Sequence, residues 1–163
     1  IFADGNIVNL ENKNWYKKIG YTPQFINLID DTIKENITYG LNLNDKRKTD
    51  NDLSSISKVC LLDEFLNKTS NGLESVVGEN GIKLSGGQKQ RIGISRTLFR
   101  DPEILILDES TSSLDLDLEK SLLKNIFSYG VKKTIVIVSH KETTLEYCDK
   151  VFNFENYQFN QVK

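Results

Sequence analysis

The sequence predicts an α/β fold in which a parallel sheet is interrupted by a mostly helical segment. Two apolar runs, 104–107 and 134–138, have the length of strands, and apolar residues at helical spacing lie between them. A strand, a helix and a second strand in this order form one βαβ unit with a right-handed parallel crossover. The middle third of the chain has helical patterns, whereas both ends have strand patterns. We therefore expect an α/β core with a helical insertion.

The first third of the chain contains a predicted turn, a strand and the start of a short helix. Asp4-Gly5 predicts a turn between two short apolar stretches. The segment 19–25 predicts a short strand that Pro23 stops, because proline cannot donate a ladder hydrogen bond. A helix is expected after Thr32, which can cap it, with Glu35 completing a reciprocal capping box.

The middle third is expected to be mostly helical. Gly40 suits the end of the short helix, and the polar segment 44–51 is expected to be a loop. From Asp52 an amphipathic helix is expected. Its apolar face consists of Leu53, Ile56 and Cys60. A further helix is predicted over 88–100, with Ile92, Leu98 and Phe99 directed inward.

The last third holds the βαβ unit. The continuous apolar run 104–107 is expected to be a strand that is covered on both faces, and the β-branched run 134–138 is likewise expected to be buried. The helix between them is predicted to end at Gly130. Its apolar stripe consists of Leu118, Leu122 and Ile126, with Leu123 and Phe127 beside it.

Composition disfavours several classes of function. The 163 residues carry 21 basic and 23 acidic side chains, so no basic excess favours nucleic-acid binding. The two cysteines, Cys60 and Cys148, lack partners at zinc-binding spacing and are expected to be reduced thiols. No apolar run approaches the roughly 20 residues that cross a bilayer.

The stretch Ser85-Gly86-Gly87 opens the predicted helix and suggests a phosphate site. Glycines let backbone N–H groups approach an anion closely, and a helix N-terminus offers unpaired N–H groups together with the positive end of the helix dipole. The alternative is that Ser85 is an ordinary N-cap residue, which is a strong preference of serine.

Two carboxylates, Asp108-Glu109, follow the buried strand directly. The carboxyl end of a parallel strand is where α/β proteins bind ligands. Asp108 is a candidate for holding Mg²⁺, mostly through water, and Glu109 is a candidate for orienting or deprotonating an attacking water. The alternative for both is a solvated acidic turn.

Three further residues are candidates because they follow strands or open a helix. His140 follows the second strand and can donate a hydrogen bond to a terminal phosphate. Gln24 follows the first strand and can present its amide oxygen to Mg²⁺ or to water. Asp115 can cap the helix after the carboxylates. Each is weak alone, since a single histidine, glutamine or capping aspartate is more often structural.

Taken together, these stretches resemble the motifs of ABC transporter nucleotide-binding domains. The matching stretches are Leu84–Gln88 (signature motif), Ile104–Glu109 (Walker B with its glutamate), Ser112–Asp115 (D-loop), Gln24 (Q-loop) and His140 (switch histidine). The segment 31–37 resembles the stretch after the Q-loop, and 77–81 resembles the loop that exporter-type members carry before the signature. The fold implied is a P-loop NTPase-like parallel-sheet core, formed by 1–25 and 101–163, with a helical subdomain over 26–100.

The resemblance implies ATP hydrolysis that drives transmembrane export of a lipid, a lipid-linked glycan or a peptide. ATP and Mg²⁺ are the implied cofactors, with Asp108 and Gln24 on the metal and with Glu109, His140 and Gln24 as catalytic residues. A second nucleotide-binding domain is the implied partner, whose nucleotide would face the signature. The nucleotide-binding residues implied are Ser85, Gly86, Gly87, Gln88, Asp108 and Asp115. No nucleic-acid partner is implied, and the location implied is the cytoplasmic face of a membrane, through a fused transmembrane domain.

The chain departs from the family pattern in lacking the Walker A motif Gly-x-x-x-x-Gly-Lys-Ser/Thr. In the family that motif precedes the Q-loop, so the chain is expected to be an N-terminally truncated piece, incomplete at its N-terminus and inactive alone. Two alternatives stay open. One is a soluble ABC-type ATPase in DNA repair, chromosome maintenance or translation. The other is a remnant without catalytic function.

Overall fold

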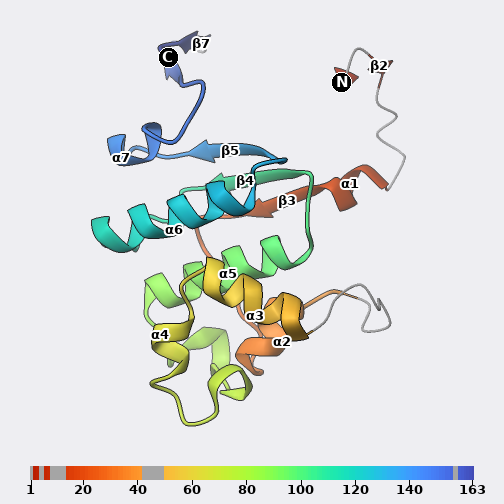
Figure 1. Cartoon of the computed structure of the whole chain (residues 1–163), viewed down its shortest axis with the longest axis vertical. Coiled ribbons are helices and arrows are strands. Elements are labelled where there is room, and N and C mark those ends of the chain that lie inside the picture. The colour runs from red at the N-terminus through yellow and green to blue at the C-terminus, as the bar shows by residue number, and fades with distance from the viewer. Residues whose placement is uncertain (1, 4–5, 8–13, 42–49, 156–157) are drawn as a thin grey trace.

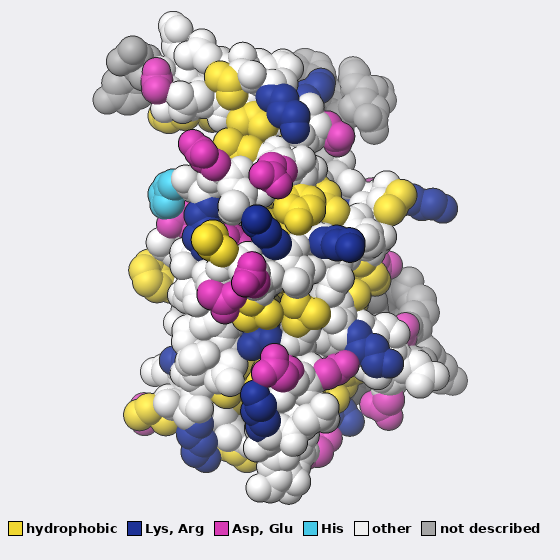
Figure 2. Space-filling model, turned by 60° about the vertical axis from the view of Figure 1, so that its left-hand side comes forward, with side chains coloured by type: hydrophobic (Ala, Val, Ile, Leu, Met, Phe, Trp, Pro, Cys, Tyr) yellow, Lys and Arg dark blue, Asp and Glu magenta, His cyan; other side chains and the backbone are white. Residues whose placement is uncertain are grey.

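The computed structural model describes residues 2–3, 6–7, 14–41, 50–155 and 158–163. These residues form a three-stranded parallel sheet, a group of helices beside it and two short hairpins (Figure 1). None of the helices in the described ranges combines the length and the apolar character that a bilayer-spanning segment requires. On the face shown in Figure 2, basic and acidic side chains are interspersed.

The helices alternate with strands at both ends of the chain and dominate its middle. The α-helices are α1 (Asn14–Lys18), α2 (Ile33–Thr38), α3 (Asp50–Val59), α4 (Asp63–Leu66), α5 (Gly86–Phe99), α6 (Leu116–Tyr129) and α7 (Glu142–Leu145). Two 3₁₀ turns, η1 (Gly72–Glu74) and η2 (Glu79–Gly81), lie between α4 and α5. The predicted α/β fold with a helical middle is confirmed.

The central sheet contains β3 (Ile19–Thr22), β4 (Ile104–Asp108) and β5 (Thr134–Val138), in the order β3-β4-β5. All neighbours are parallel, so β4, α6 and β5 form the predicted βαβ unit. β3 ends directly before Pro23, as expected from the missing proline N–H. Because the strands are parallel, their carboxyl ends meet at one edge of the sheet.

The two faces of the sheet differ, which corrects the expectation that both strands are fully buried. Leu105 and Leu107 of β4 are buried and share one apolar cluster with side chains of α5 and α6. On the opposite face Tyr21, Val136 and Val138 are exposed by 53%, 45% and 49%. Burial therefore alternates along β4 and β5, because the described helices cover only the face that carries Leu105 and Leu107.

The helical part packs around α5, which contacts α2, α3 and the sheet. The predicted apolar face of α3 is confirmed, since Leu53, Ile56 and Cys60 are buried. α3 begins at Asp50 and takes in the last two residues of the predicted loop 44–51; residues 44–49 lie outside the described ranges. In α6, the buried residues include Leu122, Leu123 and Ile126. Gly130 caps that helix, as predicted.

The cap of α2 is only partly as predicted. The Thr32 hydroxyl accepts from the amide of Glu35, at 3.0 Å between Oγ1 and N. The Thr32 amide donates to the carboxylate of Asp31 at 2.7 Å, not to Glu35. The adjacent carboxylate satisfies this donor locally, so the expected reciprocal box with Glu35 is wrong. Gly40 follows the helix at φ +75°, a conformation that glycine adopts without strain.

Two antiparallel hairpins lie near the chain ends (Figure 1). β1 (Phe2–Ala3) pairs with β2 (Asn6–Ile7). The predicted turn at Asp4-Gly5 lies outside the described ranges. β6 (Phe152–Glu155) pairs with β7 (Gln158–Gln161). The rings of Phe154 and Phe159 contact each other across this second hairpin, with centroids 4.8 Å apart.

Candidate functional site

The carboxyl edge of the parallel sheet brings three predicted site residues together. Gln24 follows β3, Glu109 follows β4 and His140 follows β5. One oxygen of Glu109 lies 2.6 Å from Nε2 of His140, and the other accepts from Nε2 of Gln24, also at 2.6 Å. These bonds leave the amide oxygen of Gln24 available to a metal or to water.

Glu109 is held in an unusual backbone conformation. Its φ is +46°, in the left-handed region that residues with a Cβ seldom adopt. The Glu109 amide donates to the carbonyl of Val138 at 2.9 Å, which extends the pairing of β4 with β5 by one residue. The carboxylate side chain is 18% exposed, whereas the imidazole of His140 is 80% exposed. The carboxylate thus sits at the sheet edge with its partner imidazole open to a ligand.

Asp108 is directed to the exposed face of the sheet, beside Tyr21. The Tyr21 hydroxyl donates to Oδ2 of Asp108 at 2.8 Å. This hydrogen bond, with smaller contributions from burial and from the negative charge of Asp108, raises the pKa of Tyr21 above its usual value. Sequence reasoning missed Tyr21 as a site residue. The missing information was the register of β3 against β4, which aligns Tyr21 with Ile106 and so puts its side chain on the face of Asp108.

The oxygen ligands at this edge suit Mg²⁺ better than a metal whose ligands are all protein side chains. Asp108 keeps one carboxylate oxygen free of the Tyr21 bond, and Gln24 offers its amide oxygen. In the described ranges there is no cluster of three or more His, Cys, Asp or Glu residues that could hold a metal ion. A small number of carboxylate and amide oxygens is what Mg²⁺ uses when water and phosphates supply the other ligands.

The predicted phosphate-binding segment lies at the start of α5. The helix begins at Gly86, two residues before the predicted start, so both glycines form its first turn. Ser85 is the N-cap: its hydroxyl accepts from the amide of Gln88 at 3.2 Å, and its own amide donates to the Gln88 side chain at 2.8 Å. The capping role of Ser85 is therefore real. The first-turn amides of Gly86 and Gly87 belong to the group that has no intrahelical partner.

The glycines also allow the segment 113–114 to pack against the start of α5. A Cβ on Gly87 would lie 2.8 Å from Cδ2 of Leu114 and 3.2 Å from the Ser113 carbonyl oxygen. Gln90, one turn later, holds the same segment, because it donates to the Ser112 hydroxyl at 3.0 Å and accepts from the Ser113 amide at 2.9 Å. Gln90 is buried and was not predicted, since nothing in its sequence neighbourhood identifies a partner 22 residues away.

Asp115 caps α6, as predicted from its position before that helix. Its Oδ1 accepts from the amide of Leu118 at 3.0 Å. The segment 110–115 thus runs from the Gln24–Glu109–His140 cluster, past the start of α5, to the cap of α6. No hydrogen bond or ion pair joins residues 85–88 directly to this cluster in the described part of the chain.

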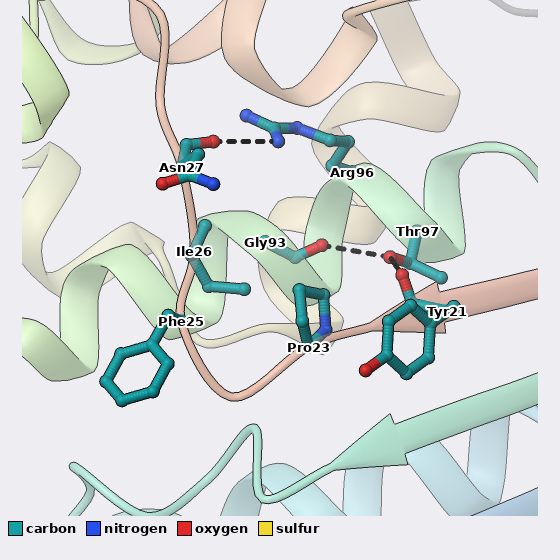
Figure 3. A pocket seen from close by; sticks show the side chains of 8 residues that line it. All are labelled: Tyr21, Pro23, Phe25, Ile26, Asn27, Gly93, Arg96 and Thr97. Carbon is teal, nitrogen blue, oxygen red and sulfur yellow. Dashed lines mark hydrogen bonds between the residues drawn. The ribbon is translucent and has the colours of Figure 1, made fainter.

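A cavity of about 140 Å³ lies between the segment that follows β3 and the helix α5 (Figure 3). Phe25 and Ile26 line it from the segment, and Gly93 and Arg96 line it from the helix. Arg96 donates to the Asn27 carbonyl at 3.0 Å, which ties the segment to α5. Phe25 is 77% exposed although it is a large apolar residue. The segment that carries Gln24 is therefore anchored on one side and open on the other.

Comparison with known proteins identifies the family. Residues 1–112 match the family described as ABC transporter. The chain is 38% identical over 152 residues to an ATP-dependent lipid A-core flippase of Vibrio parahaemolyticus, covering 93% of this chain and 26% of that protein. It is 40% identical over 152 residues to a putative export ATP-binding/permease protein of Rickettsia felis, with the same coverage.

A solved structure agrees with these relatives. The structure of a bacterial Atm1-family ABC exporter with ATP bound superposes with a TM-score of 0.81 at 31% identity, over 89% of this chain and 25% of that one. The chain spans about a quarter of the length of each of these relatives. Its sequence motifs, its parallel sheet and these matches agree, and the chain belongs to the ABC transporter family, as a nucleotide-binding domain of the exporter type.

Proposed function

We propose that this chain binds and hydrolyses ATP as the ATPase part of a membrane exporter. The observation that carries the proposal is the contact of one carboxylate, Glu109, with both Gln24 and His140 at the carboxyl edge of the sheet. A carboxylate, an imidazole and an amide at one edge suit attack by water on a terminal phosphate. Phosphoryl transfer depends on positioning and on electrostatic stabilisation rather than on covalent catalysis.

Each residue of this cluster has a role that its contacts support. Glu109 orients the attacking water and accepts its proton, since its two oxygens are held but remain partly exposed. His140 donates a hydrogen bond to the terminal phosphate, which its exposed imidazole can reach. Gln24 holds Glu109 through its amide nitrogen and directs its oxygen toward the metal or the water.

Asp108 and Gln24 are the residues we assign to Mg²⁺, directly or through water. The ion would neutralise charge on the phosphates when it is bound. Tyr21 would orient the Asp108 carboxylate toward the ion, because its hydroxyl donates to Oδ2 of Asp108 at 2.8 Å.

The residues at the start of α5 complete a second nucleotide site, that of a partner domain. Ser85, Gly86, Gly87 and Gln88 present a helix N-terminus that can bind an anion, and the hydrogen bonds of Ser85 and Gln88 stay within this segment. We assign Asp115, at the start of α6, to the same interface. In this arrangement residues 1–25 and 101–163 form the catalytic core, and 26–100 form a helical subdomain.

The names of the relatives support the export part of the proposal. They include a lipid A-core flippase and a multidrug resistance ATP-binding and permease protein of Lactococcus lactis, the latter 36% identical over 159 residues. We propose that a transmembrane domain in the same polypeptide as this chain moves a lipid, a lipid-linked glycan or a peptide. The ATPase part would then lie at the cytoplasmic face of the membrane, with a second nucleotide-binding domain as its partner.

The test uses the full-length gene product in lipid nanodiscs. ATP-dependent release of phosphate that requires Mg²⁺ is the expected result. A crosslink formed between cysteines introduced at Ser85 in one subunit and in the Walker A loop of the other would support the shared nucleotide site. Absence of any ATP turnover by well-folded full-length protein would contradict the proposal.

A further inference from the structure

An ion pair with a fully buried acid joins the loop that carries His140 to the helix α6. Its acid is Glu119, in the first turn of α6, whose side chain is fully buried. Its base is Lys141, the residue after His140, whose Nζ lies 3.0 Å from Oε2 of Glu119. The other oxygen of Glu119 accepts from the Thr111 hydroxyl at 2.6 Å. A fully buried carboxylate is retained only where hydrogen bonds and an opposite charge compensate its lost hydration.

The ammonium of Lys141 has a partner for each of its three protons. Besides Glu119, it donates to the carbonyl of Thr111 at 3.2 Å and to the carbonyl of Leu114 at 3.3 Å. The backbone of Lys141 is fixed as well, because its amide donates to the Ser139 hydroxyl at 3.0 Å. Lys141 therefore holds the loop after β5 against the segment 111–114 that follows β4.

These contacts lie next to His140 and Glu109, the two residues assigned to the reaction. His140 lies between Ser139 and Lys141 in the chain, and its imidazole is 80% exposed. The position of the imidazole relative to Glu109 therefore depends on how the backbone of Ser139 and Lys141 is held. Thr111, which Lys141 and Glu119 both contact, is two residues beyond Glu109. One ammonium thus links the chain just after His140 to the chain just after Glu109.

We infer that Lys141 and Glu119 are positioning residues that fix the loops of His140 and Glu109, whose side chains lie 2.6 Å apart, relative to each other for ATP hydrolysis. This inference rests on the proposed function, because it assigns a role within the same site. Neither side chain touches the substrate in this role. Lys141 acts on His140 through one peptide unit, and Glu119 acts on Glu109 through Thr111. A displacement of about 1 Å at a reacting group is enough to cost up to about 100-fold in rate.

The test replaces Lys141 by methionine in the full-length protein and measures steady-state ATP hydrolysis. Methionine keeps most of the length of the side chain and removes the charge and the three donors. We expect kcat to fall by about 10-fold or more while KM for ATP changes by less than about 3-fold, because transition-state positioning is lost and nucleotide binding is not.

The matched control is Lys133→Met. The Lys133 side chain is 14% exposed, compared with 29% for Lys141, and it pairs with Asp101 at 2.7 Å and donates to the Pro102 carbonyl. It lies just before β5, at the opposite end of the strand from His140. Its loss should lower the midpoint of thermal unfolding and leave kcat within about 2-fold of the wild type. An equal fall of kcat in both variants would mean a general loss of stability and would overturn the inference.

A double-mutant cycle tests whether Lys141 and Glu119 act as one unit. Glu119→Gln removes the acid and retains the size of the side chain. The fall of kcat in the double variant K141M/E119Q should be much smaller than the product of the two single effects. Multiplicative effects would show that the residues act independently and would contradict the inference.

Thr111→Val replaces these variants in the test if K141M or E119Q fails to fold. It removes the hydroxyl that donates to Glu119 and keeps the shape of the residue. A lower kcat at unchanged KM is expected, and a wild-type kcat in a folded T111V protein would contradict the inference. If the wild-type protein itself shows no ATP turnover, the proposed function fails. If the wild type turns over and K141M matches K133M, only the positioning role fails.

Discussion

Replacing Glu109 by glutamine is the change that tests the site most directly. In the structure one carboxylate oxygen lies 2.6 Å from Nε2 of His140, and the other accepts from Nε2 of Gln24, also at 2.6 Å. A glutamine at this position accepts at one oxygen only. Its amide nitrogen faces another donor, so either the Gln24 amide or the imidazole must turn. The group that takes the proton of the attacking water is lost as well.

The size of the effect follows from these two losses. A positioned general base contributes about 10²-fold to 10⁴-fold to a rate. At 1.36 kcal/mol for each factor of ten, this is about 3 to 5 kcal/mol of transition-state stabilisation. The backbone strain at Glu109, φ +46°, is the same for both residues, so the fold should be retained. ATP binding should also be retained, because the phosphate contacts assigned to other residues remain.

The assay compares phosphate release with binding of a fluorescent ATP analogue, in full-length protein in nanodiscs. Glu103→Gln is the matched control. It removes an exposed ion pair with Lys18, 2.9 Å long, that lies just before the same strand β4. Since exposed pairs contribute about 0 to 1 kcal/mol, this control should hydrolyse ATP at the wild-type rate. A kcat of the Glu109→Gln protein that equals the wild-type kcat would refute the role of Glu109.

Three further outcomes are expected. The 163-residue chain alone should show no ATP turnover, because its sequence has no Walker A motif. It should also associate during size-exclusion chromatography, because β5 is an outer strand of the described sheet and exposes Val136 and Val138 on one face. A monodisperse, active sample would contradict this. Leu122→Ala should lower the free energy of unfolding by about 2 to 5 kcal/mol, since Leu122 is fully buried. Its control is Leu116→Ala, at a residue that is 57% exposed, which should change the free energy of unfolding by less than about 0.5 kcal/mol. Burial raises the pKa of the Cys60 thiol from 9.0 to about 12. Unfolded protein therefore loses this proton first as pH rises, so the contribution of Cys60 to stability is complete below pH 9 and decreases from there to about pH 12. In thermal unfolding across this range, a Cys60→Ala protein should be less stable than the wild type at neutral pH and show a weaker alkaline decrease.

Local patterns were enough to predict most helices and the capping residues. Ser85 and Asp115 cap their helices as their positions suggest, because such hydrogen bonds join residues only three apart. In the apolar stripe of α6, Leu122 and Ile126 are buried as the spacing predicts, whereas Leu118 is only partly buried. The prediction for Glu35 was wrong because Asp31, one residue from the cap, reaches the same donor. Two acceptors in one turn compete, and the sequence does not rank them.

Burial of the strands was predicted less well. The run 104–107 is apolar throughout, which is typical of a strand with two covered faces, yet only Leu105 and Leu107 of that run are buried. An apolar residue identifies a strand that can be buried, whereas burial itself depends on which elements pack on each face. In the described ranges the apolar cluster with α5 and α6 lies on one face only.

By itself, the sequence determined that the chain is an α/β protein, where its longer helices and the strands of its central sheet lie, and which polar residues follow those strands. Those properties depend on short-range periodicity and on hydrogen bonds within a few residues. Only the tertiary structure decided which polar groups meet. Gln24 and Glu109 are 85 residues apart in sequence and contact each other because parallel strands bring their carboxyl ends to one edge. Lys141 and Glu119 pair across 22 residues for the same reason, since the chain returns through α6 to a neighbouring strand of one sheet.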